Sequence, residues 1–419
     1  MQLYDTARRA VVPFEPRNQH VGLYVCGITP YDAAHMGHAF TYHVFDVLVR
    51  RLMSTGVTVR HVRNITDVDD DILRVARERN ADYRAIGDEQ VQRFDRDMAD
   101  ISLLPVDTAP RATGHVPEMV RWIACLHEYG YAYDREGWVY FDSAVFPDFG
   151  RLSALDVPTM IALSRERGAN PDDPHKKNPL DFVLWQPSAP GEPSWPSPWS
   201  AGRPGWHIEC SVLATGDLGH PVDIHGGGDD LIFPHHEAEI AQAEAAGVAP
   251  YVRHWTHVAM VRYQGEKMSK SLGNLVFVRD VLERVPGATI RLLLAAHHYR
   301  SSWTYDEDEL RQADDRRAAY LNAVHAGASL DAEDAQAYEL QFHERLDDDL
   351  DTPGALRILD LAATALSHGG MRADDGQVSG ESLLNRLAGL LGVHLDSAAA
   401  AAAATRSASP GDRRGRESG

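Results

Sequence analysis

Hydrophobic positions divide the first part of the chain into a strand, a loop, a helix and a second strand. An apolar run over 21–25 ends at Cys26, and residues 39–52 carry apolar side chains at helical spacing. Residues 57–62 alternate like a half-buried strand, and residues 67–79 return to a helical period after an acidic start. This order predicts an α/β fold that opens as a doubly wound, Rossmann-like domain with a parallel sheet.

The rest of the chain follows three further patterns. Residues from about 105 to 204 mix helical and strand-like stretches and end in a loop rich in Pro, Ser and Trp, which predicts an insertion. The α/β pattern returns near 222–225, whereas 307–391 is almost wholly helical in period, with Pro353 at one expected helix start. We therefore expect a catalytic domain over 1–304 with the insertion inside it, a separate α-helical bundle over 305–395, and a disordered, Ala-rich tail over 396–419.

Composition narrows the functional class. The 419 residues include 41 Lys and Arg against 61 Asp and Glu, a net charge of −20. This balance argues against binding of nucleic acid by bulk charge, although a local basic patch would be compatible with it. Three scattered cysteines (Cys26, Cys125 and Cys210) cannot form a disulfide framework, and no apolar run approaches the roughly 18–20 residues that span a bilayer. We expect a cytoplasmic protein.

Two short motifs indicate phosphate chemistry. The sequence HMGH, with His35 and His38, opens the first predicted helix, whose N-terminus can bind a polyphosphate through free N–H groups and the helix dipole. The sequence KMSKS, with Lys267 and Lys270, predicts a flexible loop whose cations can close over a phosphate-bearing transition state. Each motif alone could also have a purely structural role, which is helix capping for the first and a solvated basic turn for the second. Together on an α/β chain they favour catalysis on a nucleotide.

This pair of motifs resembles the two signature sequences of class I aminoacyl-tRNA synthetases, which activate an amino acid as its adenylate. Cys26, Cys210 and His235 resemble the zinc site of the cysteinyl-tRNA synthetase family, and Glu239 matches a fourth ligand or near-ligand there. Each of these residues could also have a purely structural role, as a small buried hydrophobic residue or as a packed histidine. One zinc ion with an open position would bind the thiolate of cysteine and reject serine.

The resemblance also implies roles for further residues. His35, His38, Lys267 and Lys270 would be catalytic, acting on ATP with Mg²⁺. An amine acceptor would need a base, for which His207, Asp229 and His225 are candidates. The residues expected to bind cysteine or its adenylate are Cys26, Gly27, Ile28, Thr29, Thr41, Asn64, Ile65, Thr66, Trp206, Gly228, Asp229, Asp230 and Val261.

The acceptor of the cysteinyl group depends on the branch of the family. Cysteinyl-tRNA synthetases charge tRNA and continue past the bundle into an anticodon-binding domain, whereas the mycothiol cysteine ligases of actinobacteria use the amine of glucosaminyl-inositol. The chain length resembles the ligase branch, as do the stretches at 26–39, 166–171, 273–278, 296–303, 348–356 and 390–395.

Other features point to the synthetases. The segment 225–245 reads closer to the synthetase branch, and the position of Glu239 is usually not acidic in the ligases. We expect the mycothiol ligase reaction, with L-cysteine, ATP and glucosaminyl-inositol as substrates and no membrane partner. The alternatives are charging of tRNA(Cys), a cysteine-activating ligase of another pathway, and a catalytically silent paralogue, against which the intact motifs argue.

Overall fold

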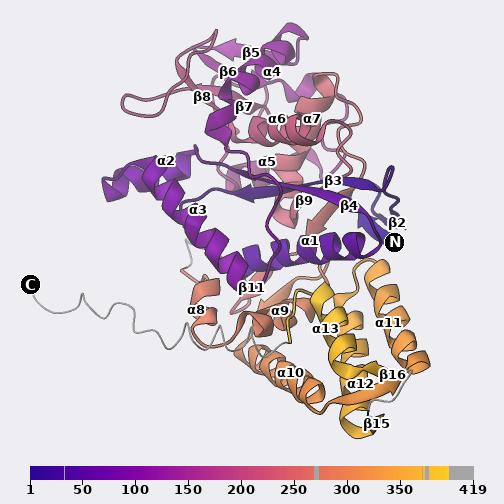
Figure 1. Cartoon of the computed structure of the whole chain (residues 1–419). Coiled ribbons are helices and arrows are strands. Elements are labelled where there is room, and N and C mark those ends of the chain that lie inside the picture. Colours follow the sequence, from indigo (N-terminus) through magenta and orange to yellow (C-terminus); the bar gives the residue numbers. More distant parts are fainter. Residues whose placement is uncertain (33, 269–272, 370, 373–376, 396–419) are drawn as a thin grey trace, which may run out of the picture.

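A four-stranded parallel sheet forms the centre of the computed structural model, which describes residues 1–419 except 33, 269–272, 370, 373–376 and 396–419. The strand order is β10-β9-β3-β4 (Figure 1). The four strands are β3 (His20–Ile28), β4 (Thr58–Ile65), β9 (Ile224–Gly228) and β10 (Trp255–Val258). β3 and β4 coincide with the strands predicted over 21–25 and 57–62. The tail predicted to be disordered lies outside the described residues.

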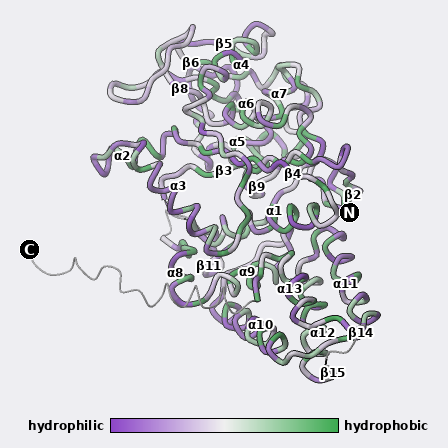
Figure 2. Tube along the Cα trace, viewed as in Figure 1, coloured by the Kyte–Doolittle hydropathy of each residue, from purple (hydrophilic) through white to green (hydrophobic). Residues whose placement is uncertain are grey.

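Helices cover both faces of this sheet. Figure 1 shows α1 (Met36–Ser54) on one side and α6 (Trp206–Leu218) with α7 (Glu237–Ala245) on the other. α1 packs closely on β9 because Gly226 has no side chain, and a Cβ there would overlap the ring of Phe45. The doubly wound α/β class predicted from the sequence is confirmed. After β4 come α2 (Asp70–Arg79) and α3 (Tyr83–Asp100), and hydrophilic residues prevail along α2 (Figure 2).

The region predicted as an insertion contains an antiparallel sheet of order β5-β6-β7-β8. Its aromatic and aliphatic side chains share one hydrophobic cluster with α6 and α7, so this sheet rests on the α6 side of the central sheet. The mixture of helical and strand-like stretches expected over 105–204 is thus present. The elements are η1 (Ala112–His115), α4 (Val116–Glu128), β5 (Ala132–Arg135), β6 (Trp138–Phe141), η2 (Ser143–Val145), α5 (Val157–Glu166), β7 (Phe182–Pro187) and β8 (Gly202–Pro204).

Short elements link the central sheet to the C-terminal helices. A π-helical turn precedes α7, and a three-stranded sheet of order β12-β11-β13 follows β10. The N-terminus forms a hairpin that the hydrophobic pattern did not predict. These elements are β1 (Gln2–Asp5), β2 (Ala10–Pro13), η3 (Asp229–Leu231), η4 (Ile232–His236), β11 (Val261–Tyr263), β12 (Glu266–Lys267), α8 (Val278–Leu282), α9 (Gly287–Ala295) and β13 (Trp303–Tyr305).

The C-terminal part is helical but not wholly so. Its helices are α10 (Glu307–His325), α11 (Ala332–Asp347), α12 (Thr352–Gly369) and α13 (Gly380–Leu390). The expected helical segment is confirmed, and a small sheet of order β15-β14-β16, which the pattern did not predict, also lies in this region. Its strands of two to four residues are too short to interrupt a helical period visibly. They are β14 (Ala328–Asp331), β15 (Met371–Arg372) and β16 (Gln377–Ser379). Pro353 is the second residue of α12, as expected for a helix start.

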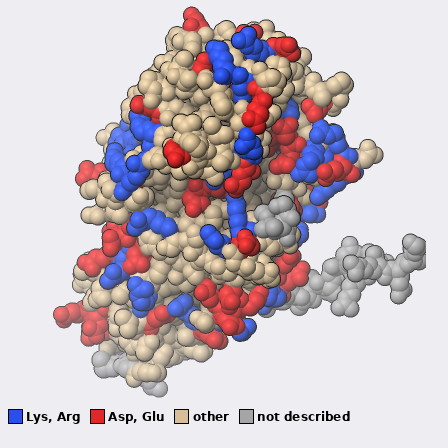
Figure 3. Space-filling model, turned by 180° about the vertical axis from the view of Figure 1, so that it is seen from behind, with Lys and Arg blue, Asp and Glu red and all other residues tan. Residues whose placement is uncertain are grey.

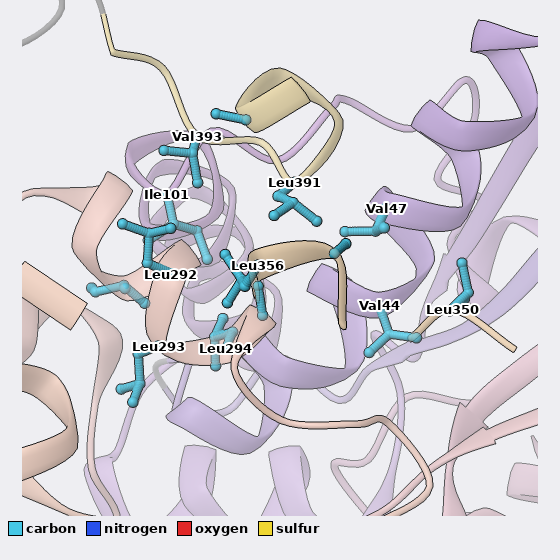
Figure 4. Packing of buried hydrophobic residues seen from close by; sticks show 14 of the residues in the cluster. Val44, Val47, Ile101, Leu292, Leu293, Leu294, Leu350, Leu356, Leu391 and Val393 are labelled. Carbon is cyan, nitrogen blue, oxygen red and sulfur yellow. The ribbon is translucent and has the colours of Figure 1, made fainter. Parts of the chain in front are cut away.

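One hydrophobic core joins α1 to the C-terminal helices. Figure 4 shows Val44 and Val47 of α1 near Leu356 of α12 and Leu391, which follows α13. Because these residues belong to a single buried cluster, packing is continuous across residue 305, and the boundary proposed there stays a prediction. Within the described part of the chain, no helix combines the length and the apolarity needed to cross a membrane.

A buried ion pair crosses the same junction. Asp46 of α1 pairs with Arg291 of α9, whose side chain is fully buried, and with Arg50 at 2.8 Å. The guanidinium of Arg291 also donates to the backbone oxygen of Leu391 at 2.8 Å. α1 is therefore tied by charge as well as by packing to the helices that follow the sheet.

Candidate active site

Four buried side chains with metal-ligating atoms meet beside the end of β3. Cys26 lies on β3, Cys210 on α6, His235 in η4 and Glu239 on α7, and their ligand atoms all lie within 4.8 Å of one another. The two sulfurs are 3.7 Å apart, and Nε2 of His235 lies 3.4 Å from the Cys210 sulfur and 3.2 Å from Oε1 of Glu239. The structure thus brings together the four residues that the family resemblance grouped.

This donor set fits a zinc ion. Zn–S bonds of about 2.3 Å in a tetrahedral site place two sulfurs about 3.8 Å apart, close to the spacing of Cys26 and Cys210. Thiolate, imidazole and carboxylate are the ligands that zinc takes in proteins. All four residues are at most 6% exposed. A cation at this point would offset the burial of two thiols and of the Glu239 carboxylate, whose ion-pair partners among the described residues are histidines.

Neighbouring side chains contact Glu239 and Cys26 of this cluster. Oε2 of Glu239 accepts a hydrogen bond from the Tyr251 hydroxyl and lies 2.9 Å from Nε2 of His225. Nε2 of His236 lies 3.2 Å from the sulfur of Cys26, and its Nδ1 lies 2.7 Å from Nε2 of His257. Such contacts orient ligands and fix imidazole tautomers.

These supporting residues were largely missed by the sequence analysis. Cys26, His225, His236 and Glu239 form a second group that could hold a metal, overlapping the first. Their sequence signal was weak, because the pair His235-His236 and a histidine at a strand end also fit ordinary core packing. Burial lowers the pKa of His257 to about 3, so this histidine is neutral at physiological pH.

An indole covers the cluster from the solvent side. Trp206, the first residue of α6, stacks on the ring of His235 with centroids 4.1 Å apart and is 36% exposed. Nδ1 of His207 lies 2.9 Å from Nδ1 of His235, on the opposite side of that ring from its contact with Cys210. His235 is therefore fixed through both nitrogens and one face.

The ends of β3 and β4 form a second group of predicted residues. The N–H of Gly27 donates to Oδ1 of Asn64 at 2.7 Å, and a Cβ on Gly27 would overlap the carbonyl of Asn64, so only glycine fits there. The N–H of Thr66 donates to the carbonyl of Ile28, and Ile28 pairs in register with Ile65. Because Gly27 follows Cys26, this group adjoins the metal-ligand cluster. Thr29 comes directly after β3.

The HMGH motif caps α1. The imidazole of His35 accepts a hydrogen bond from the N–H of Gly37 at 3.1 Å and stacks on His38 with ring centroids 3.9 Å apart. The hydroxyl of Thr41 donates to the carbonyl of Gly37. The capping interpretation of the motif is thus confirmed, and the same arrangement leaves its phosphate role as a proposal. The N–H of Met36 donates to the carbonyl of Val276, which joins α1 to the segment after the lysine loop.

The lysine loop meets the turn that follows β9. Nζ of Lys267 lies 3.4 Å from Oδ2 of Asp230, and the guanidinium of Arg167 donates to the backbone oxygen of Asp230. Gly228 ends β9 and Val261 begins β11, which leads into the loop. Lys270 lies outside the described residues.

The same turn holds a carboxyl group with an altered pKa. Burial raises the pKa of Asp229 to about 6, the charge of Asp230 adds to this effect, and Lys267 and Arg167 oppose it. A carboxyl with such a pKa changes its protonation near the pH of the cell. Cys26, Gly27 and the turn that holds Asp229 and Asp230 lie at or beyond the carboxyl ends of the parallel strands β3 and β9, where doubly wound folds bind their ligands.

Comparison with known proteins decides the family. Residues 13–315 match the model of the class I (C) tRNA synthetase catalytic domain. The chain belongs to this cysteinyl-tRNA synthetase family. As a class I (C) synthetase homologue it is an ATP-dependent ligase, and the family and enzyme class predicted from the sequence are confirmed.

Two kinds of curated relatives are equally similar to this synthetase homologue. The L-cysteine:1D-myo-inositol 2-amino-2-deoxy-alpha-D-glucopyranoside ligase of Acidothermus cellulolyticus is 43% identical over 397 residues, which are 94% of this chain and 95% of that protein. The cysteine–tRNA ligase of Cronobacter sakazakii is 42% identical over 400 residues, which are 94% of this chain and 85% of that protein. Overall identity therefore leaves the acceptor open.

Solved structures share the fold of this synthetase homologue at low sequence identity. The Agrobacterium radiobacter K84 agnB2 LeuRS, in a ternary complex with tRNA and LeuAMS, has a TM-score of 0.67 at 11% identity, covering 93% of this chain and 86% of its own. Mycobacterium tuberculosis methionyl-tRNA synthetase bound by methionyl-adenylate has a TM-score of 0.62 at 15% identity, covering 84% and 82%. The class I synthetase fold predicted from the sequence is thereby confirmed.

Proposed function

We propose that the protein activates L-cysteine as cysteinyl-adenylate and transfers the cysteinyl group to the amine of glucosaminyl-inositol. Cysteine is supported by the names of both kinds of relatives and by the buried Cys26, Cys210, His235 and Glu239 cluster. Zinc bound in this cluster would offer a coordination position to the thiolate of the substrate. Serine has no thiol and would not be bound in this way. Trp206 would cover the amino acid, and Gly27 and Thr66 would line the side formed by β3 and β4.

ATP fits at the N-terminus of α1. There the positive end of the helix dipole would face its phosphates, with the imidazoles of His35 and His38 beside them. In the first step the carboxylate of cysteine attacks the α-phosphorus, and the bond to the β-phosphate breaks. Lys267, Lys270 and the Mg²⁺ that accompanies ATP would meet the charge that develops on the leaving pyrophosphate.

The observation that carries the choice of acceptor is the carboxyl of Asp229. It is partly buried beside Lys267 and Asp230 and has a pKa of about 6, so it can take a proton near neutral pH. An ammonium acceptor must lose a proton before its nitrogen attacks the activated carbonyl and AMP leaves. We assign this proton to Asp229. His225 is fully buried against Glu239 and His207 contacts His235, so neither is as well placed.

Surface charge supports a small acceptor. The net charge is −20, and Figure 3 shows acidic and basic side chains interspersed over one face of the molecule. Binding of a tRNA relies on Lys and Arg that neutralise phosphates, whereas a cationic amino sugar is favoured by carboxylates such as Asp229 and Asp230.

Charging of tRNA is the second candidate function. The 42% identity to cysteine–tRNA ligases favours it, as does Glu239, which lies within the metal-ligand cluster as the synthetase pattern requires. A metal-ligand carboxylate contributes to cysteine selection in either reaction, so Glu239 bears less directly on the acceptor than Asp229 does.

The test is a set of product assays on the purified protein with ATP and labelled cysteine. One assay offers glucosaminyl-inositol and another offers bulk tRNA. Amide product without charged tRNA is the expected result, and charged tRNA without amide would overturn the proposed acceptor. Cysteine-dependent pyrophosphate exchange with neither product would point to another amine and another pathway. Absence of exchange would favour a silent paralogue.

A further inference from the structure

Glu209 is a fully buried carboxylate next to the metal-ligand cluster. It lies on α6 directly before Cys210, and its side chain is 0% exposed. Oε2 accepts a hydrogen bond from the Thr66 hydroxyl at 2.8 Å, whereas Oε1 is buried without a hydrogen-bond partner among the described residues. A buried carboxyl with one unpaired oxygen costs free energy, and an apolar side chain of the same size would avoid this cost. Stability therefore does not account for a glutamate at this position.

A chain of hydrogen bonds begins at Glu209 and ends beside Cys26. The Thr66 hydroxyl accepts from the side-chain amide of Asn64 at 3.2 Å, and Oδ1 of Asn64 accepts from the N–H of Gly27 at 2.7 Å. The chain runs from α6, which carries Trp206 and Cys210, to the end of β3. It therefore joins the two walls of the site proposed for cysteine.

The direction of the hydrogen bonds in this chain is set at both ends, because the N–H of Gly27 can only donate and the Glu209 carboxyl group accepts at the other end. A hydroxyl has a single hydrogen, and Thr66 commits it to the carboxyl group. Thr66 can then only accept from other groups, which sets the amide of Asn64 so that its NH₂ faces Thr66 and its oxygen faces Gly27. Without an acceptor at residue 209, the Thr66 hydroxyl could turn, and the Asn64 amide would keep its bond to Gly27 but lose a fixed partner at its NH₂ end.

We infer that Glu209 is a positioning residue for cysteine activation, which holds the Thr66 hydroxyl as an acceptor and, through Asn64, fixes the backbone of Gly27 beside Cys26. The inference rests on the proposed use of cysteine but not on the identity of the acceptor. Its effect falls on the binding of cysteine rather than on ATP, whose proposed contacts lie at the N-terminus of α1.

Two substitutions at residue 209 separate this role from simple packing. Glu209→Gln keeps a carbonyl oxygen that can accept from Thr66, so the KM for cysteine in pyrophosphate exchange should stay within about threefold of wild type. Glu209→Met fills the same volume without an acceptor and should raise that KM about fivefold to tenfold, the effect of one lost hydrogen bond. The KM for ATP and the zinc content should change little in both variants.

Controls distinguish positioning from general destabilisation. Asp181→Asn changes another buried carboxyl, which accepts hydrogen bonds from Tyr133 and Ser143 and takes no part in the hydrogen bonds from Glu209 to Gly27. It should lower the melting temperature without raising the KM for cysteine. Thr66→Val removes the same hydrogen bond from the other side. Combined with Glu209→Met it should add little further effect, and it carries the test if the methionine variant does not fold.

The results have separate meanings. A wild-type KM for cysteine in Glu209→Met, or in Thr66→Val, would overturn the positioning role. Equal losses in the glutamine and methionine variants would also overturn it, because the acceptor oxygen would then be irrelevant. Failure of the wild-type protein to exchange pyrophosphate with cysteine would instead overturn the proposed function, and it is recognised before any variant is made.

Discussion

The indole of Trp206 stacks on the imidazole of His235, with ring centroids 4.1 Å apart and an angle of 23° between the rings. Because Trp206 is 36% exposed, it separates the buried metal-ligand cluster from solvent without being part of it. Trp206→Ala should therefore raise the KM for cysteine about tenfold, since an aromatic wall is lost, while the zinc content stays at one ion per chain. Pyrophosphate exchange and elemental analysis measure the two effects. Loss of zinc along with affinity would mean that the indole chiefly supports His235.

Cys210 should be required for metal and substrate together. Its sulfur lies 3.7 Å from that of Cys26 and 3.4 Å from Nε2 of His235, so removing it takes away a ligand at the centre of the cluster. Cys210→Ser should lower zinc content well below one per chain and abolish cysteine-dependent exchange. The third cysteine provides a matched control, because Cys125→Ser alters a thiol on α4 outside the cluster and should leave both measurements unchanged. A zinc-replete, active Cys210→Ser enzyme would refute the site.

Lys267 should act in the transition state more than in ATP binding. Its ammonium is within 3.4 Å of Asp230 and half exposed, which leaves it able to move onto the pyrophosphate. Lys267→Ala should lower kcat for exchange about a hundredfold and change the KM for ATP by less than about threefold. Arg262→Ala, an exposed cation on the neighbouring strand β11, serves as the control for general charge. Parallel losses in kcat and ATP affinity would show that Lys267 binds the ground state.

The sequence predicted the strands and the helix that carry the site better than the buried polar residues inside it. Hydrophobic spacing was sufficient for β3, α1 and β4, because long regular elements bury one face or both. Cys26 and Cys210 lie 184 positions apart in the sequence, a separation that carries no spacing signal, so only family resemblance could group them. His257 and Glu209 were missed for a related reason. Their roles depend on contacts with residues distant in sequence, and a single buried polar residue shows no periodicity.

The second half-reaction should depend on pH through Asp229. Burial and Asp230 raise the pKa of this carboxyl to about 6, so it is protonated below that pH and cannot accept the proton of the amine. Single-turnover transfer from enzyme-bound cysteinyl-adenylate should thus rise as pH increases through about 6 and then level off. Asp229→Asn should remove this inflection and slow transfer about a hundredfold, with adenylate formation largely retained. An unchanged profile in Asp229→Asn would assign the base elsewhere.

The ion pair of Asp46 and Arg291 should be the most sensitive polar contact for stability. Arg291 is fully buried, and Asp46→Ala would leave its guanidinium without the carboxylate that now neutralises it. The free energy of unfolding should fall by about 3–5 kcal/mol, as measured by urea titration. In contrast, Glu78→Ala breaks a solvent-exposed pair with Arg74 and should leave the free energy of unfolding nearly unchanged.

Replacement of both partners tests the cause of that loss. Asp46→Leu together with Arg291→Met removes the charges as a pair and should recover much of the stability lost in Asp46→Ala, because no unpaired charge remains buried. Burial disfavours the ionised form of Asp46, yet Arg291 and Arg50 more than offset it and lower the pKa below its usual value of 3.8. The stabilisation is thus complete above the pKa of the unfolded chain and is lost as pH falls through the lower folded pKa. If Asp46→Ala and the double variant were equally unstable, lost packing between α1 and α9 would be the cause, and the charge pair would contribute little.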